Sequence, residues 1–544
     1  MAPTRPHVAT LVRPALAAVA LGALAVAGCA DQSVTPTEGR GAVLSLTGAV
    51  AAGGQYIIGL EPGASPDAAI AASGGRLVEA APGFGFYAVA GVADPARLRV
   101  PGVRFVERDV SVSVDAQPLN AAVPDAPTAT NQAALAAAAP APLWVTNGLQ
   151  WDLKAMSADV AIAAGARGAG INVCIIDSGL DGEHQELAGQ VTQSASFVPN
   201  SLANRDSSGH GTHVGATVGA KGVVMSGVAP GAKLFGAKVF NATGSSSSIL
   251  PFLAAVRWCA DQGAHVANMS LGGTRVLAGQ PASSNPDVQA YTEAMAYARA
   301  LGMVVVVSAG NSNLRLPNPA LVVVPAQIPG TIIVGSTAPT SRNVPALGST
   351  GLIRTLPRAV PSEWDPRRAA DVVLNADSRA YYSNFGTGVD VFAPGGRTAH
   401  SLTNPLRITT ETVVDSVTRQ PVVPARTARV QHGTVYDAVW SACSRWSGYT
   451  GSNVLANGLP GGGGQCRAAA QNTRYVGLQG TSMAAPHVAG LAALVYEAAG
   501  GVRSPEMRAK VEACIRSSTD NIGPATTFGG GRVNAVKAVA CGKS

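Results

Sequence analysis

Charged and aromatic side chains are scarce in this chain, at 13 % and 5 % of its 544 residues. Because hydrophobic residues make up 47 %, the low charge excludes an intrinsically disordered protein and favours one with a large buried core. The formal net charge is +7, but Lys and Arg are scattered along the chain without long runs. A nucleic-acid partner is therefore not expected, since nucleic-acid binding normally requires a basic cluster.

Long apolar segments are also missing, with one exception at the N-terminus. Arg5 and Arg13 precede an apolar stretch, residues 14–28, that is too short to span a bilayer and has the form of a secretory signal. Residues 1–28 are therefore predicted to be a signal peptide, and the protein to be secreted or held in the cell envelope. The stretch ends in Val-Ala-Gly-Cys, which resembles the bacterial lipobox and favours lipidation of Cys29, so that the precursor is membrane-anchored. The alternative is ordinary cleavage after Ala27, with Cys29 incidental.

Cysteine is rare, and no Cys-x-x-Cys pair is present, so that no zinc or redox centre is expected. Apart from Cys29, six of the seven cysteines remain, and an even number in an exported chain allows three disulfides. Cys174 and Cys259 lie in apolar segments, where they either pair or remain buried thiols. Short separations favour two local pairs, Cys443–Cys466 and Cys514–Cys541.

Residues 29–54 are a polar tether, and residues 55–115 have the pattern of a small α+β domain. Its predicted elements follow the order strand-helix-strand-strand-helix-strand, which is that of the ferredoxin-like fold. Residues 116–147 are rich in Ala and Pro and are predicted to be an exposed linker that holds the maturation site. The predicted strands of the domain are 56–60, 76–79, 84–89 and 103–106, and its helices are 65–74 and 94–98.

From residue 148 to residue 541, short apolar strands alternate with helices. Apolar runs without polar alternation indicate strands that are covered on both faces, hence an α/β domain with a mainly parallel sheet and helices on both sides. Two stretches break this alternation, about 337–378 and 396–475, and are interpreted as surface insertions. The predicted strands are 171–176, 234–240, 265–270, 303–308 and 331–335, and the clearest helices are 249–261 and 288–301.

Four polar residues follow strands or open helices in this domain. Asp177 directly follows the first strand, His210 opens the segment HGTHVGATVGA, Asn311 lies in SAGNS, and Ser482 lies in GTSMAAPHVAG. Amide hydrolysis by nucleophilic attack requires a hydroxyl, a base, an acid that orients the base, and donors for the oxyanion. The carboxyl ends of parallel strands and the N-terminus of a helix are places where such groups gather.

These motifs resemble the subtilisin family of serine endopeptidases. The resemblance rests on DSG, HGTHV, SLGG, SAGN, GTSMAAPHVAG, YSNFG and APGG, which span the chain from about residue 151 to residue 540. The segment 56–110 resembles the inhibitory propeptide of that family, especially in YIIGL and VRFVERD. The resemblance implies an endopeptidase that cleaves proteins through an acyl-enzyme. It is made as a self-processing zymogen whose own propeptide is an intramolecular inhibitor.

The resemblance also implies a role for individual residues. Ser482 is the nucleophile, His210 the general base and then acid, and Asp177 holds the imidazole, while Asn311 supplies the oxyanion hole. An apolar wall at residues 323–327 implies cleavage after apolar, small-to-medium side chains. The residues implied in substrate binding are Ser270, Leu271, Gly272, Gly273, Ser308, Ala309 and Gly310.

No cofactor is expected for catalysis. Many relatives hold calcium in a longer loop after the histidine helix, but residues 221–226 contain no Asp, Asn or Glu, so that this site is predicted to be missing. A structural calcium ion at another site remains an alternative, with Glu186 as a ligand. His210 and His213 have the spacing of a metal pair but lack a third ligand. His213 and His487 are therefore interpreted as structural.

Two other functions remain compatible with the sequence. One is a catalytically silent surface lipoprotein on the same scaffold, against which the complete set of catalytic residues argues. The other is a processing protease with one narrow target, which the motifs do not distinguish from a protease of broad specificity. The broad-specificity protease and the processing protease would both take protein or peptide substrates.

Overall fold

The structure is a computed structural model that describes most of the chain from residue 54 onward. The predicted signal peptide, Cys29, the tether up to residue 53 and most of the linker and of the first insertion lie outside the described residues. None of the helices in the described part of the chain is long and apolar enough to cross a bilayer. The described residues are 54–109, 112–113, 117–118, 150–241, 245–246, 248–277, 279–339, 345–347, 353–355, 377–380, 382–396, 407–408, 428–429, 438–451, 454–456, 464–466 and 473–544.

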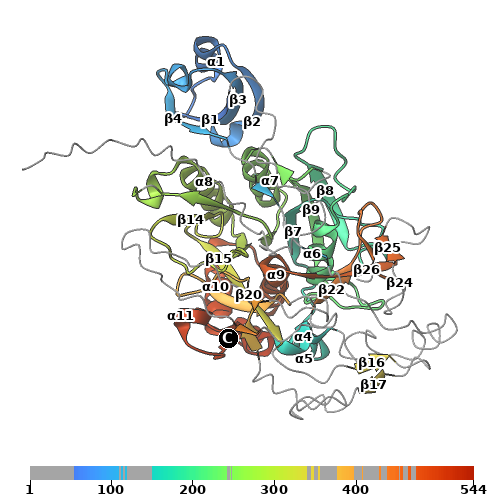
Figure 1. Cartoon of the computed structure of the whole chain (residues 1–544). Coiled ribbons are helices and arrows are strands. Elements are labelled where there is room, and N and C mark those ends of the chain that lie inside the picture. The colour runs from blue at the N-terminus through green and yellow to red at the C-terminus, as the bar shows by residue number, and fades with distance from the viewer. Residues whose placement is uncertain are drawn as a thin grey trace, which may run out of the picture.

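A twisted, mainly parallel sheet forms the centre of the molecule (Figure 1). Eight neighbouring strands are parallel, and β27 (Thr519–Asp520) and β18 (Asp377–Arg379) pair antiparallel with them. The α/β prediction is therefore confirmed. The parallel strands are, in sheet order, β8 (Val191–Ser196), β9 (Lys233–Lys238), β7 (Asn172–Asp177), β11 (Val266–Met269), β13 (Val304–Ser308), β15 (Thr331–Pro339), β19 (Val391–Pro394) and β28 (Arg532–Val533).

Helices cover both faces of this sheet, and each face has its own apolar core. Along β7, Val173 and Ile175 belong to one core, whereas Cys174 and Ile176 belong to the other. This alternation explains the unbroken apolar runs in the sequence, because both faces of each strand are buried. The first core contains residues of α4 (Trp151–Ala155), α5 (Ala158–Ala163), α6 (His210–Gly219), α9 (Thr481–Ala498), α10 (Pro505–Ser517) and α12 (Ala535–Lys543), and the second contains residues of α7 (Leu250–Asp261) and α8 (Pro286–Ala300).

Three disulfides join the six cysteines of the described domain. The two local pairs, Cys443–Cys466 and Cys514–Cys541, form as predicted. The alternative of buried thiols is wrong for Cys174 and Cys259, which are bonded to each other with their Cα atoms 5.9 Å apart. The pair forms because Cys174 belongs to the same core as the residues of α7, so that it meets Cys259 on that helix.

Residues 54–108 form a separate small domain with a four-stranded antiparallel sheet in the order β2-β3-β1-β4. The second predicted helix forms as a short 3₁₀ helix over residues 95–98, not as an α-helix. Pro101 restricts the residue before it to extended conformations, which leaves too little chain for an α-helix. The elements are β1 (Gly54–Leu60), α1 (Asp67–Ser73), β2 (Arg76–Ala81), β3 (Phe86–Val92), η2 (Pro95–Leu98) and β4 (Val103–Arg108).

The small domain docks on α7 and α8 of the large domain (Figure 1). Its sheet residues Ile57, Phe86 and Phe105 share one apolar core with those two helices. At the rim, Arg104 forms a forked ion pair with Glu293 on α8, with N–O distances of 2.7 and 3.3 Å. The contact therefore has an apolar centre and a charged rim, which is the anatomy of a protein–protein interface.

A second, smaller sheet lies beside α6 and belongs mainly to the predicted insertion 396–475. Its strands are antiparallel, and β22 packs against α6. Two very short strands from the segment after the small domain join the large domain: β5 (Val112–Ser113) pairs with β10 (Ser245–Ser246), and β6 (Gln117–Pro118) pairs with this second sheet. The other strands of this second sheet are β22 (Val439–Ala442), β26 (Arg474–Gln479) and β24 (Val454–Ala456).

Candidate active site

Asp177 and His210 meet at the carboxyl edge of the parallel sheet. Asp177 is the last residue of β7, and His210 is the first residue of α6. The His210 Nδ1–H donates to the Asp177 carboxylate, with Nδ1 2.8 Å from Oδ1 and 2.9 Å from Oδ2. Both side chains are buried. The ring is therefore held in the tautomer that leaves Nε2 as the basic nitrogen.

A third buried residue, Asp206, fixes the position of this pair. Its carboxylate accepts from the Ser178 hydroxyl (2.7 Å), the Gly209 N–H (2.8 Å), and the N–H and hydroxyl of Thr212 (2.7 and 2.6 Å). Ser178 follows Asp177, while Gly209 precedes His210, so that one carboxylate ties the end of β7 to the start of α6. Sequence reasoning missed Asp206, because it lies before the N-cap Gly209, outside the position where a capping residue is expected.

Ser482 lies in the first turn of α9, which begins at Thr481. Gly480 before it has φ +147, a conformation that favours glycine. The Ser482 hydroxyl donates to the Ser270 carbonyl at 3.2 Å, and the Ser270 hydroxyl donates to the Ser482 carbonyl at 2.7 Å. Asn268, expected to be a structural strand residue, donates to the Ser270 hydroxyl at 2.9 Å. The positive end of the helix dipole at this N-terminus favours negative charge next to Ser482.

Asn311 follows β13 and faces the same turn. Its Oδ1 accepts from both the N–H and the hydroxyl of Thr481, at 2.9 and 2.7 Å. Thr481 in turn accepts from the Gly310 N–H at 3.2 Å. Because Oδ1 is engaged with Thr481, the amide can only present its Nδ2 donors on the other side, which is the side nearer Gly480. Thr481 is a second residue that the sequence reasoning missed.

The YSNFG segment holds the loop of Gly310 and the turn of Gly480 together. The Tyr382 hydroxyl accepts from the Gly480 N–H at 3.0 Å and donates to the Gly396 carbonyl at 2.7 Å. Asn384 donates to the Ala309 carbonyl at 2.7 Å. The sequence showed this segment only as part of the family pattern, without a role, because its function depends on contacts between distant segments.

The other residues implied in substrate binding surround this centre. Ser270 and Leu271 are buried, and Gly273 begins β12 (Gly273–Val276), which pairs with β14 (Leu321–Val324). Ser308 ends β13, and its hydroxyl donates to the Leu271 carbonyl at 3.4 Å. Ala309 is buried behind Asn311. The loops that bear Ser270–Gly273 and Ser308–Gly310 are thus joined to each other and to the Ser482 turn.

The remaining buried histidines make structural contacts. The His213 ring lies 3.1 Å from the Val439 carbonyl, and burial lowers the pKa of His213 to about 3. The His487 ring bridges Asp152 (3.0 Å) and the Met483 carbonyl (2.7 Å). His213 thus contacts β22, whereas His210 contacts Asp177. Among the residues that the structure describes, no three His, Cys, Asp or Glu side chains cluster as a metal site.

Glu186 does not fit a calcium ligand, contrary to the alternative that the sequence left open. Its Oε2 accepts from the N–H groups of Gly222 and Val223 (3.3 and 2.9 Å), and its Oε1 from those of Val224 and Met225 (2.7 and 3.1 Å). The Tyr475 hydroxyl also donates to Oε1, at 2.8 Å. Both oxygens thus face hydrogen-bond donors, whereas a calcium site gathers oxygens around the ion.

The family model of the subtilases, peptidase S8, matches residues 168–531. Subtilisin DY from Bacillus licheniformis is 27 % identical over 388 residues, which cover 71 % of this chain and 96 % of the relative. Alkaline elastase YaB from Bacillus sp. (strain YaB) is 26 % identical over 388 residues, which cover 71 % of this chain and 68 % of the relative.

Solved structures with the same fold support this match. The epidermin leader peptide processing serine protease (EpiP) from Staphylococcus aureus has a TM-score of 0.59 at 17 % identity, covering 91 % of this chain and 99 % of that one. Fervidolysin from Fervidobacterium pennivorans, a keratinolytic enzyme, has a TM-score of 0.56 at 20 % identity, covering 90 % of this chain and 61 % of that one. This chain therefore spans about three fifths of fervidolysin's length. Since the family model covers well over half of its residues, the chain belongs to the subtilase family and is a serine endopeptidase.

Proposed function

We propose that Ser482 attacks the carbonyl carbon of a peptide bond, while His210 removes the proton of its hydroxyl. The leaving amine takes that proton from His210, and water then hydrolyses the acyl-enzyme by the same exchange in reverse. Asp177 holds the ring and stabilises its positive charge. The contact between Asp177 and His210 carries this proposal, because it orients the imidazole at the sheet edge where the first turn of α9 presents Ser482.

The oxyanion of the tetrahedral intermediate would be bound by the Ser482 N–H and the Asn311 Nδ2. Thr481 supports this assignment, since it binds the Asn311 Oδ1 and so leaves the amide nitrogen as the group that faces the reaction. A donor of this kind typically contributes about 3 kcal/mol of transition-state stabilisation, a magnitude measured in subtilisin itself. The mechanism requires no metal or organic cofactor.

The small domain would be the inhibitory propeptide of a self-processing zymogen. Three contacts trace the chain that leaves it: Asp109 faces Ser248, β5 pairs with Ser245 and Ser246, and β6 pairs with the strand that precedes Ser482. The segment thus pairs with the large domain at two places, Ser245–Ser246 and Leu478–Gln479, as a bound peptide would. The bond cut during maturation would lie between Ser113 and Gln117, at or before the start of the 116–147 linker.

If the chain is exported and lipidated at Cys29, maturation would also release the enzyme from the membrane. Cys29 lies on the far side of the propeptide from the enzyme domain, so that a cut after Ser113 would separate the enzyme from its lipid. The precursor would be anchored and the mature enzyme soluble, unless the propeptide stays bound. Replacing Cys29 with Ser should move the precursor from the membrane fraction to the soluble fraction, while leaving the mature enzyme soluble.

The proposed activity is tested by comparing wild-type protein with Ser482→Ala. We expect only the wild type to shorten by the length of the propeptide and to hydrolyse casein. A matched control, Ser504→Ala, removes another serine at a helix N-terminus, the N-cap of α10, which follows the C-terminal end of α9. Equal shortening of wild type and Ser482→Ala would remove self-processing, and casein hydrolysis by Ser482→Ala would remove the proposed nucleophile.

A further inference from the structure

The strand that precedes Ser482 has two edges with different occupants. On one edge, β22 pairs with β26 over four positions, from Val439 opposite Leu478 to Ala442 opposite Tyr475. That edge is therefore closed by the protein's own chain. The opposite edge of β26 must hold every other strand that pairs with these residues, because each strand has only two edges.

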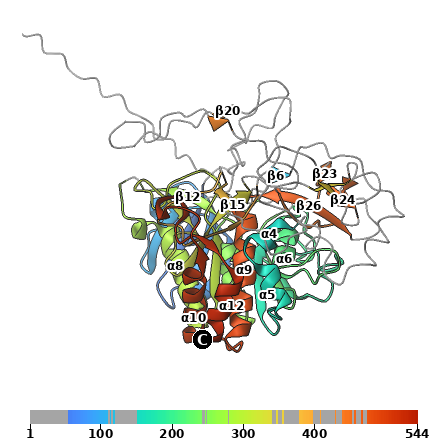
Figure 2. The same ribbon diagram turned by 90° about the horizontal axis from the view of Figure 1, so that it is seen from below.

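The opposite edge is shared by β6 and β24. Gln117 and Pro118 of β6 lie opposite Gln479 and Leu478, while Val454 of β24 lies opposite Val476. Leu478 and Val476 also pair with β22. Both β6 and β24 are therefore on the edge that β22 leaves open, one behind the other (Figure 2).

The two strands run in the same direction. Each is antiparallel to β26, so that β24 continues along the line of β6. A single position, opposite Gly477, separates Pro118 from Val454 in the register. At a rise of about 3.4 Å per residue, this gap spans roughly 7 Å and has room for one residue. A peptide that pairs with Gln479 and Leu478 therefore meets β24 one residue later.

We propose that β24 closes the primed end of the peptide-binding edge, so that a substrate chain pairs with Gln479 and Leu478 and then leaves the sheet. The primed side is the part of a substrate that follows the cut bond. This inference rests on the proposed function, in which the chain from β5 to β6 lies as a substrate does. The enzyme would accordingly cleave loops and chain ends that can turn away, in preference to long extended segments.

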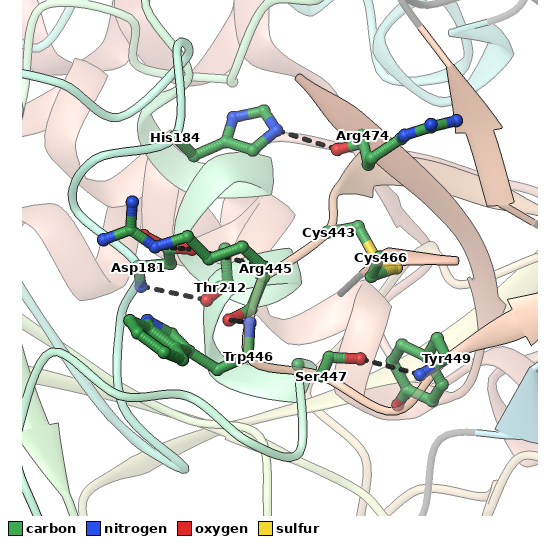
Figure 3. Close-up of a disulfide and its surroundings, with 12 residues drawn as sticks. Asp181, His184, Thr212, Cys443, Arg445, Trp446, Ser447, Tyr449, Cys466 and Arg474 are labelled. Carbon is green, nitrogen blue, oxygen red and sulfur yellow. Dashed lines mark hydrogen bonds and ion pairs between the residues drawn. A yellow bond between two sulfur atoms is a disulfide. The ribbon is translucent and has the colours of Figure 1, made fainter. Parts of the chain in front are cut away.

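The closed end is held firmly by the fold. Cys443 follows β22 directly, its N–H donates to the Arg474 carbonyl at 2.9 Å, and it is bonded to Cys466 (Figure 3). The His184 ring contacts the same Arg474 carbonyl at 2.7 Å. Tyr475 is tied to Glu186 through its hydroxyl. A substrate strand would have to displace β24, which pairs with β26 at three positions, to extend past Gly477.

The test uses the self-processed enzyme and peptides of its own sequence. All peptides begin at Val110 and end at successive positions from Gln117 to Pro124, and kcat/KM is measured for each. We expect kcat/KM to rise as the peptide grows to Leu119 and then to stay within about twofold, because later residues have no strand to pair with. A further rise of about tenfold from Leu119 to Pro124 would overturn the proposal.

A shortened variant makes the test reciprocal. Replacing residues 452–463 with Gly-Gly removes β24 but keeps both Cys443 and Cys466. In this variant we expect longer peptides to gain kcat/KM, while the peptide ending at Pro118 is cleaved as by wild type. A plateau at Leu119 in a folded variant would contradict the role of β24. If the variant does not fold, the wild-type series still decides. If wild type cleaves no peptide at all, the proposed activity itself fails.

Discussion

The buried carboxylates of the active-site region differ from those beneath the small domain. Burial raises the pKa of Asp206, but the four hydrogen bonds that it accepts from three residues and the nearby Lys238 oppose this rise. Asp109 accepts one hydrogen bond within its own domain, from Gln55 at 2.8 Å, and burial raises its pKa to about 7. Burial also raises the pKa of Glu79 and of Glu107 at the same interface.

This difference separates a permanent structure from a contact that can dissociate. A buried carboxylate surrounded by donors fixes the groups around it and is hard to remove. A buried carboxyl with few donors is stable mainly while it is protonated, so that its interface depends on pH. The candidate active site is thus expected to persist, and the docking of the small domain to be reversible.

The largest expected effect is that of Asp177→Asn. The amide cannot stabilise an imidazolium and favours the wrong tautomer of His210, so that kcat should fall about 10⁴-fold. The measurement is steady-state hydrolysis of a peptide by matured enzyme. Asp159→Asn, which alters a carboxylate paired with Lys154 on α4 and α5, should leave kcat unchanged. A loss below about tenfold for Asp177→Asn would remove its orienting role.

The next effect is on stability. Asp206→Ala leaves Ser178, Gly209 and Thr212 with unsatisfied donors, and should lower the free energy of unfolding by about 3–5 kcal/mol. Urea unfolding in the Ser482→Ala background measures this without self-digestion. Asp159→Ala is again the control. If the two substitutions destabilised the protein equally, the contrast between carboxylates with many and with few hydrogen-bond donors would not hold.

The pH dependence of propeptide release tests the other side of the comparison. In the docked state, burial raises the pKa of Asp109 from 3.8 to about 7, so that we expect Asp109 to take up a proton as the interface forms. Docking strength should be greatest below about pH 4 and should fall as the pH rises towards 7. If the chain is cut as proposed, we expect at least about tenfold weaker retention of the small domain at pH 8 than at pH 5. Asp109→Asn should flatten this dependence, whereas equal retention by wild type at both pH values would refute it.

The smallest effect is expected at the rim of the interface. Arg104→Ala removes the forked pair with Glu293, whose side chains are 29 % and 39 % exposed. Since exposed ion pairs contribute at most about 1 kcal/mol, retention of the propeptide should weaken only a few-fold. A double-mutant cycle with Glu293→Ala isolates the pair. A coupling energy larger than the effect of Asp109→Asn on retention would reverse the expected order of these two effects.

The architecture and the central site could be predicted from the sequence because their signals are local. Apolar runs indicated the parallel sheet, and the observed strands lie within one or two residues of most predicted ends. β15 is an exception that runs on to Pro339, since its last three residues pair with β18. Asp177, His210, Asn311 and Ser482 all stand at strand or helix ends, as their motifs indicated.

What the sequence could not provide depends on contacts between distant segments. Asp206, Thr481 and Tyr382 bind groups that lie far away along the chain or in another loop. Cys174 and Cys259 are separated by 85 residues, so that their spacing gave no sign of pairing. The register of β24 behind β6 is likewise a property of three dimensions, because the two strands lie in different parts of the chain.

Glu186 also connects segments that are distant along the chain. Its carboxylate closes the turn after α6 and, through Tyr475, connects that turn to β26. Because this clasp consists only of covalently attached groups, it assembles as the chain folds and needs no ion from the surroundings. Chelating agents therefore have no ion to remove from it, and an ion-poor medium leaves it intact.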